Sequence, residues 1–182
     1  SGHSVKRIAA RPESTITPDI ISVTDAIAAI SSGEYAQRDR DRVDLVFEEA
    51  VRRGIVLGGS FLDSRWETDL SGLSLPVGRA AVRFILKGIL KQFVENPASF
   101  EPSTLTFITG VGSRKPRSND LGEQLMSLRD YVQHSLEVDF DPAISSTIPQ
   151  RALGTVQVDP KELGRWLEVN RGNEKSKLAK SC

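Results

Sequence analysis

The chain has 182 residues, 38% of them hydrophobic, which is enough to bury a core and excludes a chain that is disordered throughout. Because 24 basic residues balance 24 acidic ones, a nucleic-acid site would have to be a local cluster of cations. The single cysteine and the two distant histidines, His3 and His134, exclude a disulfide framework and indicate no metal site. No apolar run approaches the ~18 residues of a membrane span.

Both ends of the chain are expected to lie outside the folded part. Ser1-Gly2-His3-Ser4 is typical of a cloning remnant, so residues 1–17 are predicted to be disordered or derived from a tag. The chain lacks an initial methionine, and we interpret it as a piece excised from a larger protein. Residues 171–182 are polar and are predicted to form a disordered tail.

Residues 18–55 predict a helical hairpin. The first helix is expected to begin at Thr24 or the residue after it and to end near Gly33. The second is expected to run from about Asp39, with apolar residues at the i, i+3, i+4, i+7 spacing of an amphipathic helix. Gly54 supplies its C-terminal stop.

Residues 56–170 alternate between strand and helix patterns. The predicted elements are, in chain order, a strand at 68–70, a helix from Ser74 to Phe93, a strand at 105–109, a helix at 121–136, strands at 138–140 and 155–158, and a helix that begins at Pro160 and ends by Gly172. This order, β-α-β-α-β-β-α, predicts an α/β two-layer sandwich with a small mixed sheet. The first crossover is expected to be parallel and right-handed.

The segment 109–117 is the most informative part of the chain for function. It leaves a predicted buried strand, turns through Gly110 and Gly112, and carries three cations and no acid. Glycines allow positive φ values and bring backbone N–H groups close to an anion. The side chains expected to contact phosphate are Thr109, Ser113, Arg114, Lys115 and Arg117, with Arg151 joining them from a later turn. The alternative interpretation is a mobile, solvated loop.

A row of cations follows the predicted helix between Ser74 and Phe93. Its members, four residues apart, are Arg79, Arg83, Lys87 and Lys91. At a rise of 1.5 Å per residue they span about 18 Å, enough to follow several phosphates of a nucleic-acid strand. The alternative is a solvated helix face opposite the core.

Three further candidates are weaker. The alternating acids Glu137, Asp139 and Asp141 could hold a divalent ion, but acids on an exposed strand face are normally solvated. His134 is expected to be a surface residue. Trp166 has core spacing, which favours packing over base stacking.

Two segments of residues 66–170 resemble the Smr (small MutS-related) domain. The first is Asp69-Leu70-Ser71-Gly72-Leu73-Ser74 and the second is Ile108-Thr109-Gly110-Val111-Gly112, where the family usually has Leu-Asp-x-His-Gly and Thr-Gly-x-Gly. The later segment 151–158 matches the family's glycine-then-strand ending. The resemblance implies a fold like the C-terminal domain of a bacterial translation initiation factor. It also implies nucleic-acid binding, with endonuclease activity in some members.

The chain departs from the family at Ser71, which stands where the family has histidine. A histidine there could act as a general acid or base, because its pKa lies near neutrality, and serine cannot. Asp69 remains as a carboxylate that could orient a water or a 2′-hydroxyl group. These two residues are the catalytic candidates. We therefore expect an endoribonuclease activity to be weakened, with Mg²⁺ as a cofactor only if the domain cleaves.

The hairpin resembles one pentatricopeptide repeat, a family with a period of roughly 35 residues. The matching segments are Pro18-Asp19-Ile20-Ile21-Ser22, Phe47-Glu48-Glu49-Ala50 and Arg53-Gly54-Ile55. A plain helical hairpin that caps the next domain is the alternative. Together the two resemblances suggest an RNA-processing protein of an organelle, chloroplast or mitochondrion, with single-stranded RNA or a ribonucleoprotein such as the ribosome as partner.

Two rival functions stay open. One is a non-catalytic module that docks on the ribosome or on a partner protein. The other is a nucleotide- or phosphometabolite-binding enzyme that uses the glycine loop. The second ranks last, because the chain lacks Gly-Lys-Ser/Thr after that loop and has no longer Gly-x-Gly-x-x-Gly.

Overall fold

The computed structural model describes residues 18–31, 36–57, 66–110 and 126–180. In chain order the elements are α1 (Ile20–Ser31), α2 (Ala36–Arg52), β1 (Glu67–Asp69), α3 (Leu75–Glu95), the short 3₁₀ helix η2 (Pro97–Ser99), β2 (Leu105–Ile108), α4 (Leu128–Val138), β3 (Thr155–Val158) and α5 (Pro160–Lys180). The described part is therefore a mixed α/β fold, as the sequence predicts. Residues 1–17, predicted to be disordered or tag-derived, lie outside it.

The three strands form one sheet in the order β1-β2-β3. β1 and β2 are parallel, with Thr68 beside Phe107, and β2 and β3 are antiparallel, with Phe107 beside Val156. The central strand β2 is buried along most of its length, whereas β3 alternates between half-buried and buried residues. β1 and β2 are joined through α3, so the parallel pairing predicted for the first crossover is confirmed.

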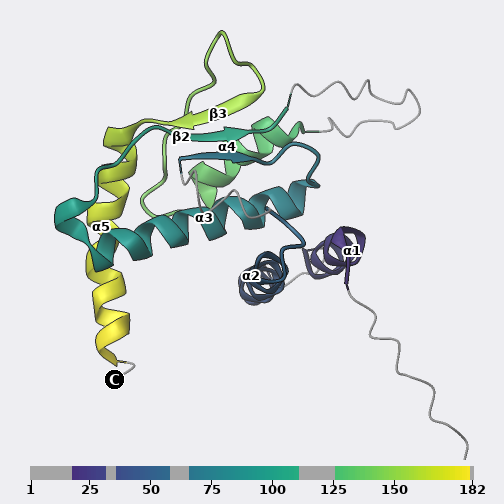
Figure 1. The fold of residues 1–182 in the computed structure, drawn as a ribbon, viewed down its shortest axis with the longest axis horizontal. Helices are drawn as coiled ribbons and strands as arrows, with labels where there is room; N and C mark the ends of the chain where they lie inside the picture. The colour runs from purple at the N-terminus through teal and green to yellow at the C-terminus, as the bar shows by residue number, and fades with distance from the viewer. Residues whose placement is uncertain (1–17, 32–35, 58–65, 111–125, 181–182) are drawn as a thin grey trace, which may run out of the picture.

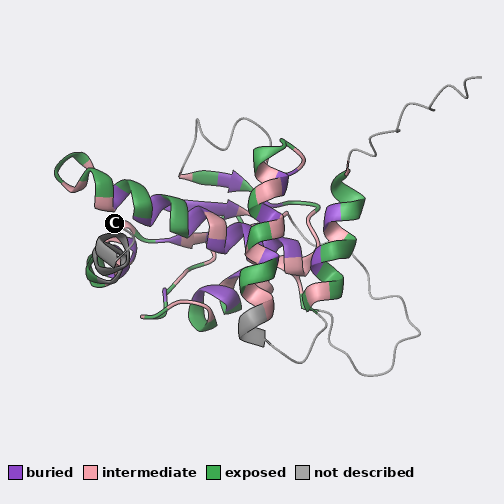
Figure 2. Cartoon of the chain, turned by 90° about the horizontal axis from the view of Figure 1, so that it is seen from below, coloured by how far each residue is buried: buried purple, intermediate pink, exposed green. Residues whose placement is uncertain are grey.

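α3 is the central helix of the fold and lies between the sheet and the α1–α2 hairpin (Figure 1). Pro76 stands in its first turn, and buried residues occupy most of its length. α5 crosses its C-terminal end (Figure 1), where Arg171 lies 5.7 Å from the Phe93 ring. Buried residues gather where the helices and the sheet meet, and the outer faces of the helices are exposed (Figure 2).

The predicted hairpin is present, but α1 begins earlier than expected. The carboxylate of Asp19 accepts a hydrogen bond from the backbone N–H of Ser22 at 2.8 Å and so caps the helix ahead of Thr24. α2 ends as predicted at Gly54, whose φ is +71°, and the N–H of Ile55 donates to the carbonyl of Ala50 at 2.9 Å. Helix ends are thus satisfied locally in both arms.

The hairpin packs against α3 through apolar side chains. Phe47 of α2 is fully buried and meets the Phe84 ring of α3 edge-on, with centroids 5.7 Å apart. Val23 and Ile27 of α1 are buried in the same core. The hairpin therefore shares one continuous core with the α/β part.

The strand predicted at 138–140 is wrong. α4 continues to Val138, and the N–H of Asp139 closes the helix by donating to the carbonyl of Ser135 at 2.9 Å. Phe140 then turns inward onto Trp166, with ring centroids 5.7 Å apart. Phe140 therefore belongs to the segment that follows α4 and not to a strand. The described sheet has three strands instead of the four predicted.

Two predicted helix boundaries also differ. α4 begins at Leu128, because Ser127 caps it by accepting from the N–H of Asp130 at 3.2 Å. The earlier part of that predicted helix, residues 121–125, lies outside the described residues. α5 continues to Lys180, so most of the predicted disordered tail is helical. Trp166 is buried, in agreement with the packing interpretation.

Candidate nucleic-acid interface

The two segments that carry the Smr resemblance meet at the carboxyl ends of β1 and β2. Asp69 is the register partner of Ile108, and the N–H of Leu70 donates to the carbonyl of Ile108 at 2.7 Å. A Cβ atom built on Gly110 would lie 3.4 Å from the Cβ of Ser71. Residues 39 positions apart in the chain thus approach each other closely, because parallel strands bring their carboxyl ends to one edge.

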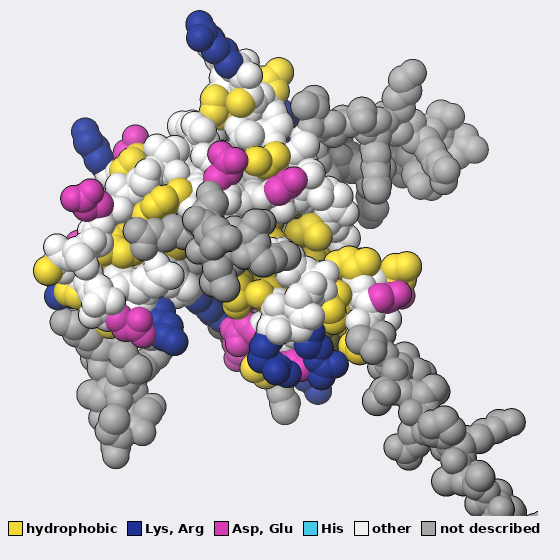
Figure 3. Space-filling view, viewed as in Figure 1, with side chains coloured by type: hydrophobic (Ala, Val, Ile, Leu, Met, Phe, Trp, Pro, Cys, Tyr) yellow, Lys and Arg dark blue, Asp and Glu magenta, His cyan; other side chains and the backbone are white. Residues whose placement is uncertain are grey.

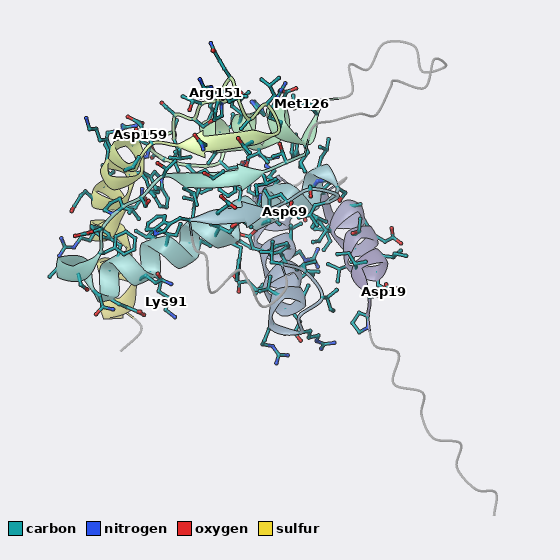
Figure 4. The ribbon with its side chains drawn as sticks, turned by 45° about the horizontal axis from the view of Figure 1, so that its top comes forward. Asp19, Asp69, Lys91, Met126, Arg151 and Asp159 are labelled. Atoms are coloured by element: carbon teal, nitrogen blue, oxygen red, sulfur yellow. The ribbon has the colours of Figure 1, made fainter. Side chains whose placement is uncertain are left out.

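The turn after β1 is shaped by Asp69. Its carboxylate accepts a hydrogen bond from the backbone N–H of Ser71 at 2.8 Å, and Gly72 follows with a φ of +82°. The N–H of Leu73 closes the turn on the carbonyl of Leu70 at 3.1 Å. Asp69, Ser71 and Gly72 are exposed, so the turn presents a carboxylate and a hydroxyl to solvent (Figure 4).

Gly110 adopts the backbone conformation that the sequence predicts for a glycine turn. Its φ is +74°, in the left-handed region that residues with a side chain rarely enter. The rest of the segment, including Gly112, Ser113, Arg114, Lys115 and Arg117, lies outside the described residues. The contribution of those side chains therefore stays a prediction.

Thr109 has a different place from the one expected. Its side chain is buried, and its hydroxyl donates to the carbonyl of Gly154 at 2.9 Å, while its backbone N–H donates to the same oxygen at 2.7 Å. A hydroxyl held in this way is not directed at a ligand. Thr109 instead fastens the end of β2 to the beginning of β3, and we assign it a positioning role.

The N-termini of α3 and α4 lie side by side next to this turn. A Cβ on Gly78, in the first turn of α3, would come within 2.7 Å of the Leu128 side chain at the start of α4. Glycine at this position is what permits the close approach. A helix N-terminus carries about half a positive charge from its unpaired N–H groups. Two such termini therefore add to the positive potential at this edge of the sheet.

Arg151 is the described cation that best fits the edge. Most described Arg and Lys side chains have an acidic partner within 4.0 Å, but within the described ranges Arg42, Arg151 and Lys161 have none. Arg151 is exposed three residues before Gly154, the residue that holds Thr109. Figure 4 shows Arg151 and Met126 along one border of the molecule. Its charge is thus available to an anion there.

The predicted row of cations on α3 is paired with acidic side chains, and one of its members is buried. Arg83 is 7% exposed and its guanidinium contacts Asp44 of α2 at 2.6 Å; Lys87 contacts the same carboxylate at 2.6 Å. Arg79 binds Asp139 through two nitrogens. Lys87 and Lys91 keep largely exposed side chains, Lys87 beside Asp44 and Lys91 next to Glu95. We therefore remove Arg83, which is buried under the hairpin, from the expected strand contacts, whereas Arg79 and Lys87 are already paired with acidic side chains.

The same network overturns the solvated interpretation of Asp139. Its side chain has 0% exposure and accepts from the hydroxyl of Ser135 at 2.8 Å, with Arg40 of α2 at 3.2 Å and Arg83 at 3.6 Å. Burial alone would raise the pKa of this carboxyl, but hydrogen bonds from Arg79 and Ser135 and the adjacent positive charges outweigh it and hold the pKa below its ordinary value. Asp139 thus ties the hairpin to α3 and α4.

Sequence reasoning missed this network because its partners are far apart in the chain. Asp44 and Arg83 are 39 residues apart, and Arg79 and Asp139 are 60 apart. No local pattern marks such pairs. On the face seen in Figure 3, Lys and Arg side chains stand in small groups, with acidic side chains close to several of them.

Within the ranges that the structure describes, no three His, Cys, Asp or Glu side chains stand close enough together to hold a metal ion. No helix in those ranges has the length and apolar character needed to cross a membrane. Arg151 and the Asp69–Ser71 turn therefore define an edge of polar and basic groups without a metal cluster among the described residues.

No protein-family model, curated protein or solved structure matches the chain. The fold by itself defines a mixed α/β protein with a helical hairpin packed on its central helix.

Proposed function

We propose that the chain binds single-stranded RNA through the carboxyl ends of β1 and β2, as an Smr-type domain preceded by a helical hairpin of pentatricopeptide-repeat type. The observation that carries this proposal is the contact between Gly110, in a positive-φ turn, and Ser71 on the neighbouring turn. These are the two positions at which the Smr resemblance is most specific. Their juxtaposition supports a single site built from both segments.

Physical chemistry favours an anionic ligand at this edge. Ligands of open α/β sheets bind outside the carboxyl ends of parallel strands. Here a glycine turn can present backbone N–H groups, two helix N-termini lie alongside, and Arg151 has no acidic partner among the residues that the structure describes. A charge-balanced protein with one such edge suits phosphate-backbone contacts, which position a strand without reading its sequence.

Binding is better supported than cleavage. Ser71 does not titrate near neutrality, and an oxygen of Asp69 already accepts the N–H of Ser71 at 2.8 Å. Mg²⁺ in nucleic-acid enzymes is usually held by one or two carboxylates together with substrate phosphates, and this turn offers the single carboxylate of Asp69. In the proposed site Asp69 orients a 2′-hydroxyl group. We expect weak cleavage at most. The corresponding parent is an RNA-processing protein of the chloroplast or the mitochondrion.

The test is binding of an unstructured RNA oligonucleotide by the full chain and by a variant with Arg114, Lys115 and Arg117 changed to alanine. We expect the variant to bind more weakly and with a salt dependence reduced by about 0.7 per lost phosphate contact. An unchanged affinity and an unchanged salt slope would remove the loop from the site. Adding Mg²⁺ to the same mixture measures cleavage separately.

A further inference from the structure

A polar pocket lies between the hairpin and the first turns of α3 and α4. Its volume is about 130 Å³ and its polar lining consists of Ser31, Asp39, Arg40, Arg79, Arg83 and Tyr131. Three arginines from two helices thus line one cavity, and arginine is the side chain best suited to hold a phosphate group. This pocket faces the hairpin and is separate from the Ser71–Gly110 contact.

The arginines have more hydrogen-bonding capacity than their partners use. Each guanidinium has five N–H donors, whereas the carboxylates of Asp139 and Asp44 offer about four acceptor positions each. Asp139 is shared by Arg40, Arg79 and Arg83, and Asp44 is shared by Arg83 and Lys87. With Asp39 included, the three arginines of the pocket face three carboxylates, so an anion would be held by the spare N–H donors and not by an excess of positive charge.

The size of the pocket limits what can enter. Pockets that hold drug-sized ligands measure about 300–1,000 Å³, so a whole nucleotide does not fit in about 130 Å³. The space holds several water molecules and therefore also one tetrahedral phosphate group. The Tyr131 hydroxyl, 3.5 Å from a nitrogen of Arg79, stands at the same cavity as a further donor.

We propose that this pocket binds one phosphate group through Arg40, Arg79 and the Tyr131 hydroxyl. Free phosphate and the terminal phosphate of an RNA strand present the same chemistry. Arg79 is four residues into α3, about 6 Å along the helix axis from its first residue. A strand end that leaves the Ser71–Gly110 edge along α3 would reach the pocket. The binding of free phosphate does not depend on the RNA-binding proposal.

The experiment compares thermal unfolding of the full chain in phosphate and in chloride at equal ionic strength. The test variant is Arg40→Gln and the matched control is Arg42→Gln, two residues along α2 and without an acidic partner among the described residues. We expect phosphate to raise the Tm of the native chain and of Arg42→Gln, since a ligand that binds only the folded state stabilises it. Arg40→Gln should need at least about tenfold more phosphate for the same rise.

A second variant, Tyr131→Phe, keeps the ring and every guanidinium and should bind phosphate several-fold more weakly by calorimetry. Equal Tm values in phosphate and chloride for the native chain would overturn the proposal, and so would equal losses of the phosphate effect in Arg40→Gln and Arg42→Gln.

Oligonucleotides with and without a 5′-phosphate distinguish free phosphate from the terminal phosphate of a strand. Tighter binding of the phosphorylated strand, lost in Arg40→Gln, assigns the pocket to a strand end; equal binding beside a phosphate-dependent Tm assigns it to free phosphate. Absence of binding to the 5′-hydroxyl strand bears only on the Ser71–Gly110 edge.

Discussion

Gly110 and Ser71 lie against each other at the end of the parallel strand pair, so close that a methyl group on Gly110 would sit 3.4 Å from the Cβ of Ser71. The contact depends on the β1–β2 register, which places Asp69 beside Ile108. It also depends on the hydrogen bonds of Thr109 to Gly154, which fix where β2 ends. A substitution at Gly110 or at Ser71 should therefore alter the position of the other residue.

The first prediction concerns Gly110→Ala. The φ of +74° is unfavourable for alanine by about 1–2 kcal/mol, and the new methyl group would lie against Ser71 on the proposed binding edge, so both stability and RNA affinity should fall. Denaturant unfolding measures the first effect and a binding titration the second. Gly88→Ala is the matched control. It lies within α3 with open space around its Cβ position, so the substitution should stabilise the protein by about 0.5–1 kcal/mol. If Gly110→Ala and Gly88→Ala changed the free energy of unfolding in the same direction, the backbone geometry assigned to Gly110 would be contradicted.

The second prediction concerns Asp139. Replacing it with asparagine leaves Arg40, Arg79 and Arg83 around a neutral group in a buried place, and breaking a buried ion pair in this way costs about 3–5 kcal/mol. Chemical unfolding gives the difference directly. Asp141→Asn, two residues on and exposed, is the control and should change the free energy of unfolding by less than about 0.5 kcal/mol.

The pH dependence of stability provides a further readout for Asp139. Its pKa in the folded protein lies below the ordinary value, so its contribution is present above the unfolded pKa of about 3.9 and is lost as pH falls through the folded pKa. Between about pH 6 and about pH 3 the native chain should lose more stability than Asp139→Asn. Parallel curves for the two proteins would show that the carboxylate is not held as described.

Both the success and the failure of sequence reasoning here have physical causes. α3 and β3 were predictable, because Ser74, Pro76 and the apolar spacing mark the start of a helix, and the run 155–158 alternates polar and apolar residues as a half-buried strand does. The 138–140 segment was not, since one apolar residue after a helix end gives the same alternation as a strand. The burial of Arg83 was not predictable either, because its partner Asp44 belongs to another helix.

The candidate site, like the fold, was predictable only in part. The glycine turn and the Asp69–Ser71 segment could be identified from their residues, and their contact follows from parallel pairing. That Thr109 uses its hydroxyl internally could not, because the acceptor is a backbone carbonyl 45 residues away.

The third prediction places at position 71 the histidine that the proposed Smr-type site would carry. Ser71→His puts an imidazole on an exposed turn, where it can take a proton from a 2′-hydroxyl near Asp69. We expect RNA cleavage in the presence of Mg²⁺ above that of the native chain. The rate should rise with pH through about 6.5, because a general base acts in its deprotonated form. The double variant with Asp69→Asn controls for contamination and should cleave less; equal cleavage by both would argue against a site at this turn.

The fourth prediction concerns Arg151. Its guanidinium has no acidic partner among the described residues, so Arg151→Ala should weaken RNA binding and reduce the slope of log affinity against log salt by about 0.7. Stability should change by less than about 0.5 kcal/mol. Arg42→Ala removes an exposed cation on the far side of α3 and should leave the slope unchanged. A slope that falls equally in both variants would indicate a general charge effect.

The most direct measurement is a nuclear magnetic resonance titration of the isotope-labelled full chain with single-stranded RNA. We predict that the largest amide shifts fall on Ser71, Gly72 and Gly110, with smaller shifts at Arg151 and little change at Leu45 on the outer face of α2. Shifts confined to the hairpin, or an unchanged spectrum at an RNA concentration well above that of the protein, would contradict this prediction.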